Sequence, residues 1–242
     1  FGALKKLTEH IVKGGVEYLV IMGTTGENPV LSYQEQNTVL DYVAEVSYKK
    51  IPIIFGIAGN NTQAVVNRIK ETDFSHIDAI LSATPYYNKP TQKGLYIHYK
   101  TIASASPVPI ILYNVPGRTS VNMNAETTVK LAKDFENIIA VKEASGNLDQ
   151  IMQLIKNKPD DFVVLSGDDT YTLPYIALGM EGVISVTANA FPKQFSDMVR
   201  AALANKFAEA RALHYALLDL SNSLFLEGNP CGVKAALEIL DI

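Results

Sequence analysis

The chain has 242 residues, of which 48% are hydrophobic and 19% are charged, a composition that excludes a disordered protein. The 21 Lys and Arg residues against 25 Asp and Glu residues give a net charge of −4, so no strong field attracts nucleic acid or an anionic membrane surface. The single cysteine, Cys231, excludes a disulfide framework within the chain.

The longest apolar runs, near residues 51–59 and 108–115, are too short to span a bilayer, which needs about 18 residues or more. The first residues read as the opening turns of an amphipathic helix, and they lack the pattern of a signal peptide. We therefore expect a soluble, cytoplasmic protein.

Seven short apolar runs, rich in valine and isoleucine, recur along the chain. They do not alternate with polar residues, which is typical of strands buried on both faces in a parallel sheet covered by helices. The predicted strands are residues 18–22, 51–56, 79–83, 109–113, 138–141, 162–165 and 182–186.

Amphipathic segments fill the gaps between these runs and predict helices. The segment 32–46 opens with Ser32 and carries Glu35 three residues later, which is the spacing of a capping box. The other predicted helices are residues 62–72, 92–103, 125–135, 148–155 and 173–178.

A serial run of such βα units indicates either a doubly wound sheet or a (β/α)₈ TIM barrel. We expect the barrel, formed by residues 1–190. Because the chain starts with a helix, a closed barrel needs one more strand before Phe1, and we expect that first strand to be missing from this chain. Three further helical stretches at 192–204, 207–226 and 232–240 predict a C-terminal helical appendage, residues 191–242.

Polar residues follow several of the predicted strands. In a parallel barrel the active site lies where the strands end, so these residues are candidates for the site. The segments that follow the strands bring hydroxyls, two cations and carboxylates to one rim of the sheet. These segments are residues 23–27, 84–88, 113–119, 142–144 and 166–169.

Lys142 is the most informative of these residues because it directly follows a buried strand. An apolar surrounding disfavours the charged form of a lysine and frees the amine lone pair to attack a carbonyl group. The alternative is a lysine that caps the strand end and pairs with Glu143 or Asp168.

The other rim residues also have two interpretations. Tyr113 can carry a proton only if its phenol is linked to another hydroxyl, and otherwise it is a rim tyrosine with its ring in the core. Thr24 and Thr25 could cap a turn, and Arg118 could bind either a substrate carboxylate or an acidic neighbour. Gly-Thr-Thr-Gly is not a phosphate-binding Walker motif, because no Gly-Lys-Ser/Thr follows it.

No metal site is expected, because the four histidines lie at spacings that do not suit a shared metal ion. We expect all four to be ordinary surface residues on helices or helix ends. They are His10, His76, His98 and His214.

Taken together, the ordered motifs resemble the dihydrodipicolinate synthase family, in the N-acetylneuraminate lyase superfamily of class I Schiff-base aldolases. The resemblance spans essentially the whole chain. The Thr-Thr pair and Arg118 favour the synthases over the sialic acid lyases. The motifs lie at residues 23–27, 85–90, 113–119, 141–144, 166–169, 182–187 and 229–230.

The resemblance implies that Lys142 forms an imine with pyruvate, and that the derived enamine adds to L-aspartate 4-semialdehyde. No metal or organic cofactor is required, since the lysine imine is the electron sink. The implied catalytic residues are Lys142, Tyr113, Thr24 and Tyr87, the last entering the site of an adjacent subunit. The implied substrate-binding residues are Thr25 and the backbone at Ile184 for the pyruvate carboxylate, Arg118 for the second substrate, and Gly167.

Two alternative functions differ from this one. A sister aldolase would condense pyruvate with another aldehyde, and Arg118 argues for a short acidic aldehyde over a neutral sugar. A barrel that has become a binding protein would have lost Lys142 or Tyr113, and both are present.

The resemblance also implies a homo-oligomer, a tetramer built as a dimer of dimers, and a site where lysine inhibits some members. Ala64 stands where sensitive members carry a glutamate, so we expect weak or absent inhibition unless Glu27 or another nearby carboxylate replaces it. The positions matching that site are Asn28, Pro29, Tyr33, Gln36, Asn60, Ala64 and Tyr86.

Overall fold

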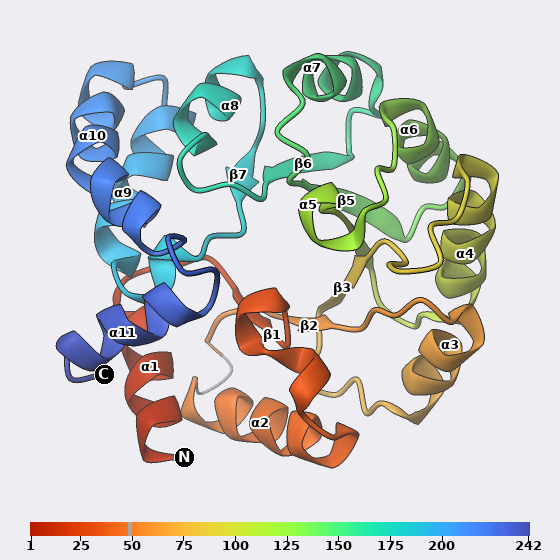
Figure 1. The fold of residues 1–242 in the computed structure, drawn as a ribbon, viewed down its shortest axis with the longest axis horizontal. Helices are drawn as coiled ribbons and strands as arrows, with labels where there is room; N and C mark the ends of the chain where they lie inside the picture. Colours follow the sequence, from red (N-terminus) through yellow and green to blue (C-terminus); the bar gives the residue numbers. More distant parts are fainter. Residues whose placement is uncertain (48–49) are drawn as a thin grey trace.

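The computed structural model describes residues 1–47 and 50–242. These residues form one parallel sheet of seven strands in chain order, surrounded by helices (Figure 1). The strands are β1 (Leu19–Ile21), β2 (Ile53–Gly56), β3 (Ala79–Ala83), β4 (Ile110–Asn114), β5 (Ile138–Glu143), β6 (Val163–Ser166) and β7 (Gly182–Val183). The seven predicted strands are therefore confirmed, with shifts of one to three residues at most ends.

Helices alternate with the strands as predicted. Ser32 caps α2, and its side chain and that of Glu35 form the expected capping box. The longer helices are α1 (Gly2–Lys13), α2 (Tyr33–Val46), α3 (Thr62–Glu71), α4 (Gln92–Ala105), α6 (Ala125–Asp134), α7 (Leu148–Asn157), α8 (Thr172–Leu178), α9 (Pro192–Leu203), α10 (Phe207–Ser223) and α11 (Cys231–Ile239). Short helical turns that the periodicity did not predict are η1 (Thr24–Gly26), η2 (Asn28–Val30), α5 (Pro116–Thr119) and η3 (Thr187–Asn189).

The sheet is curled, so that its two edge strands approach each other. The Tyr18 hydroxyl, next to β1, donates a hydrogen bond to the Val183 carbonyl oxygen in β7 at 3.3 Å. The described residues thus form a curled parallel sheet of seven strands, and the closed barrel of eight strands stays a prediction. In the described part of the chain no helix is long and apolar enough to cross a membrane.

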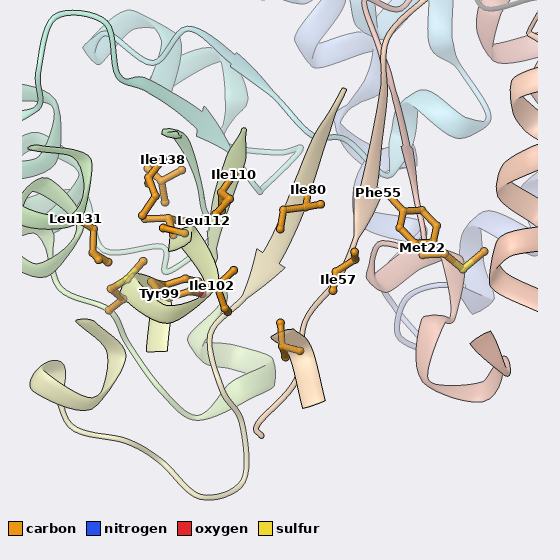
Figure 2. Packing of buried hydrophobic residues seen from close by; sticks show 14 of the residues in the cluster. Met22, Phe55, Ile57, Ile80, Tyr99, Ile102, Ile110, Leu112, Leu131 and Ile138 are labelled. Carbon is orange, nitrogen blue, oxygen red and sulfur yellow. The ribbon is translucent and has the colours of Figure 1, made fainter. Parts of the chain in front are cut away.

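Apolar side chains cover both faces of the strands, as the unbroken apolar runs predict. Successive residues alternate between the helix side and the inside of the curl. Phe55 and Ile80 belong to the cluster on the helix side, which also contains Tyr99 and Ile102 of α4; Figure 2 shows Phe55 beside Met22, and Tyr99 beside Ile102. Ile54 and Leu81 belong to a second cluster on the opposite face. Burial on both faces stabilises the sheet and leaves the strand ends to carry the polar groups.

The C-terminal helices pack on the rest of the molecule through two apolar clusters. Phe195 and Met198 of α9 pack with Leu173 of α8 and with α10, and Val233 of α11 packs with Val186 after β7. Because α9 contacts α8 and β7, it continues the ring of helices, as Figure 1 shows. The division of the chain at residue 190 into two units stays a prediction.

Candidate functional site

Strand β5 ends in two ionisable residues that point to opposite faces of the sheet. Parallel pairing puts Tyr113 of β4 beside Lys142, and Asn114 beside Glu143. Because consecutive side chains in a strand alternate between faces, Lys142 follows Ala140 into the curl and Glu143 follows Val141 toward the helices. Glu143 is therefore not the partner of Lys142, which removes one alternative that the sequence left open.

The Lys142 amine lies in a largely apolar surrounding. The side chain is 8% exposed, and its Nζ lies 4.4 Å from the centroid of the Tyr113 ring. A cation over a ring face is stabilised by the ring quadrupole, so Tyr113 suits a positive charge on this nitrogen. Among the described residues, no carboxylate forms an ion pair with Lys142, and Asp168 instead accepts hydrogen bonds from Thr170.

Gly167 makes the room in which the Lys142 side chain lies. A Cβ atom at Gly167 would stand 3.1 Å from Lys142 Cε and 2.6 Å from the Ala144 Cβ. The Gly167 amide donates to the Glu143 carbonyl oxygen at 2.8 Å, so this backbone is held against the end of β5. A side chain here would overlap Ala144 and crowd the lysine stem.

A cavity of about 560 Å³ brings four of the predicted site residues together. It runs from the inside of the curl, between β1 and β7, outward to α1, α9 and α11, and its walls are mostly apolar. Its lining includes Lys142, Thr24, Thr25 and Ile184. The Ile184 amide already donates to the Ser166 carbonyl oxygen at 3.0 Å, so the backbone group of Ile184 that remains for a ligand is its carbonyl oxygen, an acceptor.

The loop that carries Thr24 and Thr25 is held by unusual backbone angles. Met22 and Glu27, at its two ends, have φ angles of 60° and 52°, in the left-handed region. The side-chain amide of Asn28 donates to the carbonyl oxygens of Met22 and Gly56, at 3.0 and 3.1 Å. These contacts fix both threonines at the mouth of the curl.

The other four predicted site residues are not part of the cavity lining; Tyr113 and Gly167 lie next to Lys142, whereas Tyr87 and Arg118 lie at the surface. Tyr87 is 86% exposed and has a φ of 70°, and Arg118 is exposed on the short helix α5. Within the described chain the Tyr113 hydroxyl makes no hydrogen bond to Thr24 or Tyr87. One chain therefore does not assemble the expected proton relay, which stays a prediction.

Behind the site lies a buried polar network that our sequence analysis did not identify. Glu143, 1% exposed, accepts hydrogen bonds from the Ser145 amide at 2.7 Å and from the Asn114 and Gln150 side chains at 3.0–3.2 Å. Burial raises the pKa of Glu143, although these donors oppose the shift. Asn122 closes the network by contacts with Asn114 and Gln150. A signal was present, because Asn114 and Glu143 each follow a predicted site residue.

Asp169 forms a second buried anchor that the sequence did not single out. Its carboxylate accepts from the amides of Val186 and Thr187 and from the Thr187 hydroxyl, at 2.7–3.0 Å. Burial raises its pKa. The Thr187 hydroxyl also contacts the Ser221 hydroxyl in α10 at 3.0 Å, so this carboxylate ties the end of β6 to the C-terminal helices.

One histidine differs from the expectation that all four lie at the surface. His98 is 4% exposed, because α4 turns it against Thr62 of α3, whose hydroxyl lies 2.8 Å from Nδ1. Burial lowers its pKa to about 4, so it is neutral at physiological pH. In the described part of the chain no three His, Cys, Asp or Glu residues are grouped so that they could hold a metal ion.

Comparison with known proteins points to one family. The model of the "Dihydrodipicolinate synthetase family" matches residues 1–242. A 4-hydroxy-tetrahydrodipicolinate synthase of Azobacteroides pseudotrichonymphae is 52% identical over 240 residues, which cover 99% of this chain and 81% of that protein.

Solved structures of the same kind share the fold. A dihydrodipicolinate synthase from Aquifex aeolicus superposes with a TM-score of 0.95 at 43% identity, over 99% of this chain and 82% of that one. A structure described as the first monomeric dihydrodipicolinate synthase variant superposes with a TM-score of 0.96 at 36% identity, over 98% of this chain and 80% of that one.

Asn114→Asp tests the buried network. The change keeps the shape but turns the donor that faces Glu143 into an acceptor, so we expect the free energy of unfolding at pH 7 to fall by about 1–3 kcal/mol. The loss should shrink toward pH 4, because carboxyls whose pKa is raised by burial are protonated as the pH falls, and one protonated oxygen can again donate. Urea unfolding at several pH values measures both effects.

Asn67→Asp is the matched control for that substitution. Asn67 is exposed and its side-chain oxygen accepts from Gln63, a role that aspartate keeps. Its effect should stay within about 0.5 kcal/mol. Equal effects of the two substitutions would contradict a special role for the buried network.

Proposed function

We propose that this chain, which belongs to the dihydrodipicolinate synthetase family, condenses pyruvate with L-aspartate 4-semialdehyde to 4-hydroxy-tetrahydrodipicolinate through an imine on Lys142. The relatives that carry the name of this synthase are about 50% identical over nearly the whole chain. The observation that supports the chemistry is a lysine inside the curl, free of any carboxylate in the described structure and facing a cavity that two threonines line.

The first step joins Lys142 to pyruvate. The neutral amine attacks the ketone carbon, a C–N bond forms, and the ketone oxygen leaves as water after taking up two protons. The resulting cationic imine lies over the face of the Tyr113 ring, which stabilises positive charge. The lysine itself is thus the electron sink, and no metal or organic cofactor takes part in the proposal.

The second step forms the new carbon–carbon bond, closes the ring and releases the lysine. Loss of a proton from the pyruvate methyl group gives an enamine. The enamine carbon adds to the aldehyde carbon of the second substrate, the aldehyde oxygen takes up a proton, and the cationic imine forms again. The amine of that substrate then attacks the imine carbon, closes the ring and expels the lysine as a free amine. Hydroxyls of Tyr113 and Thr24 carry the protons in this proposal, with Tyr87 contributed by a neighbouring chain.

The carboxylates of the substrates need their own donors. Thr25, at the mouth of the curl, offers a hydroxyl to the pyruvate carboxylate. The Ile184 carbonyl oxygen only accepts, so it suits a hydroxyl or an N–H group of the bound substrate and not the carboxylate. Arg118, exposed outside the cavity, is free to bind the carboxylate of the longer substrate as it arrives. A sister aldolase acting on another aldehyde remains the second candidate, and an assay with aspartate 4-semialdehyde decides between them.

A homo-tetramer built as a dimer of dimers is part of the proposal. Its support is Tyr87, a large aromatic residue that is 86% exposed on a loop with a positive φ. A neighbouring chain could accept this side chain into its own site. We also propose a cytoplasmic location, where such a biosynthetic enzyme meets its substrates, and a (β/α)₈ barrel as the architecture of the enzyme.

Weak inhibition by lysine is the last part of the proposal. Besides the missing glutamate at Ala64, the structure places a cation beside the matching residues: the Arg68 guanidinium lies 4.4 Å from the centroid of the Tyr33 ring. A second cation would be repelled there. Glu27 is engaged with Lys234 at 3.0 Å, so it is not a free substitute for the glutamate.

Lys142→Ala should abolish covalent trapping of pyruvate by borohydride, because no amine remains to form the imine. Intact-mass spectrometry checks this, with Lys130→Ala, an exposed lysine on α6, as the variant that still gains the mass. Trapping at another lysine in the Lys142→Ala protein would contradict the assignment.

Tyr113→Phe and Thr24→Val should each lower kcat by about 10²–10⁴-fold with a much smaller effect on the KM for pyruvate, because they remove proton carriers and leave the amine. Steady-state kinetics in a coupled assay measures both constants. A near-normal kcat for either variant would remove that residue from the proposed relay.

The oligomer is checked by light scattering during dilution, with activity measured on the same samples. We expect activity to follow the assembled species, and Tyr87→Phe to lower kcat while leaving the mass unchanged. A fully active monomer of this protein would contradict the role of Tyr87.

Lysine titrated into the assay should reach half-inhibition only well above submillimolar concentration. Ala64 cannot make the charged hydrogen bond of a glutamate, and the loss of such a bond weakens binding by about ten- to a hundredfold. Ala64→Glu should increase the sensitivity, and Ala64→Gln, of the same shape but without the charge, should not. Half-inhibition of the unaltered protein at submillimolar lysine would overturn this expectation.

A further inference from the structure

The C-terminal helices reach back to the loop that carries Thr25. The side-chain amide nitrogen of Asn229 donates a hydrogen bond to Thr25 Oγ1 at 3.0 Å, although the two residues are 204 positions apart. The next residue, Pro230, lines the same cavity as Lys142 and Thr25. A residue far along the chain is thus in direct contact with a hydroxyl of the candidate site.

This contact determines what the threonine hydroxyl can do. A hydroxyl has one hydrogen to donate and two lone pairs that accept. Because Thr25 Oγ1 accepts from Asn229, and donates to no group in the described chain, its hydrogen is left for a ligand in the cavity. A carboxylate, which only accepts, is the ligand that such a donor suits, and a bond to a charged acceptor is stronger than a neutral one.

The segment that presents Asn229 is closely packed. A Cβ atom at Gly232 would overlap the Leu224 carbonyl group, so the backbone at Gly232 packs closely against the backbone at Leu224. The Asn229 side-chain oxygen is buried and has no partner among the described residues. Among the described residues, the bond from the amide nitrogen to Thr25 is therefore the hydrogen bond that this side chain makes.

We propose that Asn229 is a positioning residue, which makes the Thr25 hydroxyl a permanent hydrogen-bond donor toward the substrate carboxylate. The inference rests on the proposed function, in which Thr25 binds the carboxylate of pyruvate. Asn229 acts through Thr25 and does not itself touch the substrate.

Asn229→Asp is the decisive variant, because it keeps the shape and replaces the donor with an acceptor. An aspartate would take the hydrogen of Thr25 and leave its lone pairs facing the carboxylate. We expect the pyruvate concentration that half-saturates borohydride trapping to rise about tenfold or more. Asn229→Ala, which leaves the hydroxyl free to rotate, should have a smaller effect.

A structural role alone predicts the opposite order. Loss of packing would make Asn229→Ala the more harmful change and the isosteric aspartate the milder one. It would also make Lys234→Ala similarly harmful, since Lys234 ties α11 to the same loop through Glu27 at 3.0 Å. We expect Lys234→Ala to leave pyruvate trapping unchanged, because both partners of that ion pair are partly exposed.

Thr25→Val supplies the second readout. If Asn229 acts through Thr25, changing Asn229 to Ala in a Thr25→Val protein should shift half-saturation less than twofold further. Pyruvamide, which has the same ketone without the charge, separates the carboxylate from the rest of the substrate. Asn229→Asp should raise half-saturation for pyruvate more than for pyruvamide. Circular-dichroism melting of each variant confirms that it is folded.

The outcomes distinguish two failures. If the unaltered protein is not trapped by pyruvate at all, the proposed function fails and this inference fails with it. If the unaltered protein is trapped but Asn229→Asp keeps normal half-saturation, only the inference is overturned, and the amide lies turned with its oxygen toward Thr25. Equal losses for pyruvate and pyruvamide would also overturn it.

Discussion

The alternation of side chains at the ends of two neighbouring strands is the constraint on which the candidate site depends. The pairing of β4 with β5 places Tyr113 beside Lys142 on the inner face and Asn114 beside Glu143 on the outer face. A shift of one residue would bring the carboxylate into the cavity and the amine among the helices. The register therefore keeps the Lys142 amine, which must be neutral to attack a ketone, away from the Glu143 carboxylate, which would stabilise its protonated form.

The buried polar groups around the site stabilise this register. Glu143 stabilises the register on the outer face of the sheet. Its carboxylate accepts hydrogen bonds from Asn114 of β4, from Ser145 and from Gln150 of α7, and these bonds form when β4, β5 and α7 are in place. Such a network is costly when partly broken, so it favours one arrangement over its neighbours. The reacting face stays simple by comparison: an amine, an aromatic ring and hydroxyls at the mouth of the curl.

Much of this architecture could be predicted from the sequence, because unbroken apolar runs and capping patterns are local signals. The strand that carries Lys142 and the cap at Ser32 are examples. What could not be predicted depends on contacts between distant segments. The bond from Asn229 to Thr25 and the burial of His98 by Thr62 have no periodic signature. The Glu143 network was within reach, since Asn114 and Glu143 directly follow the two residues that attracted attention.

A crystal structure of the protein soaked with pyruvate tests the central claim most directly. The account predicts continuous density between Lys142 Nζ and the ketone carbon of pyruvate, with the carboxylate within hydrogen-bond distance of Thr25 Oγ1. Pyruvate bound without a covalent bond, or joined to a different lysine, would contradict it.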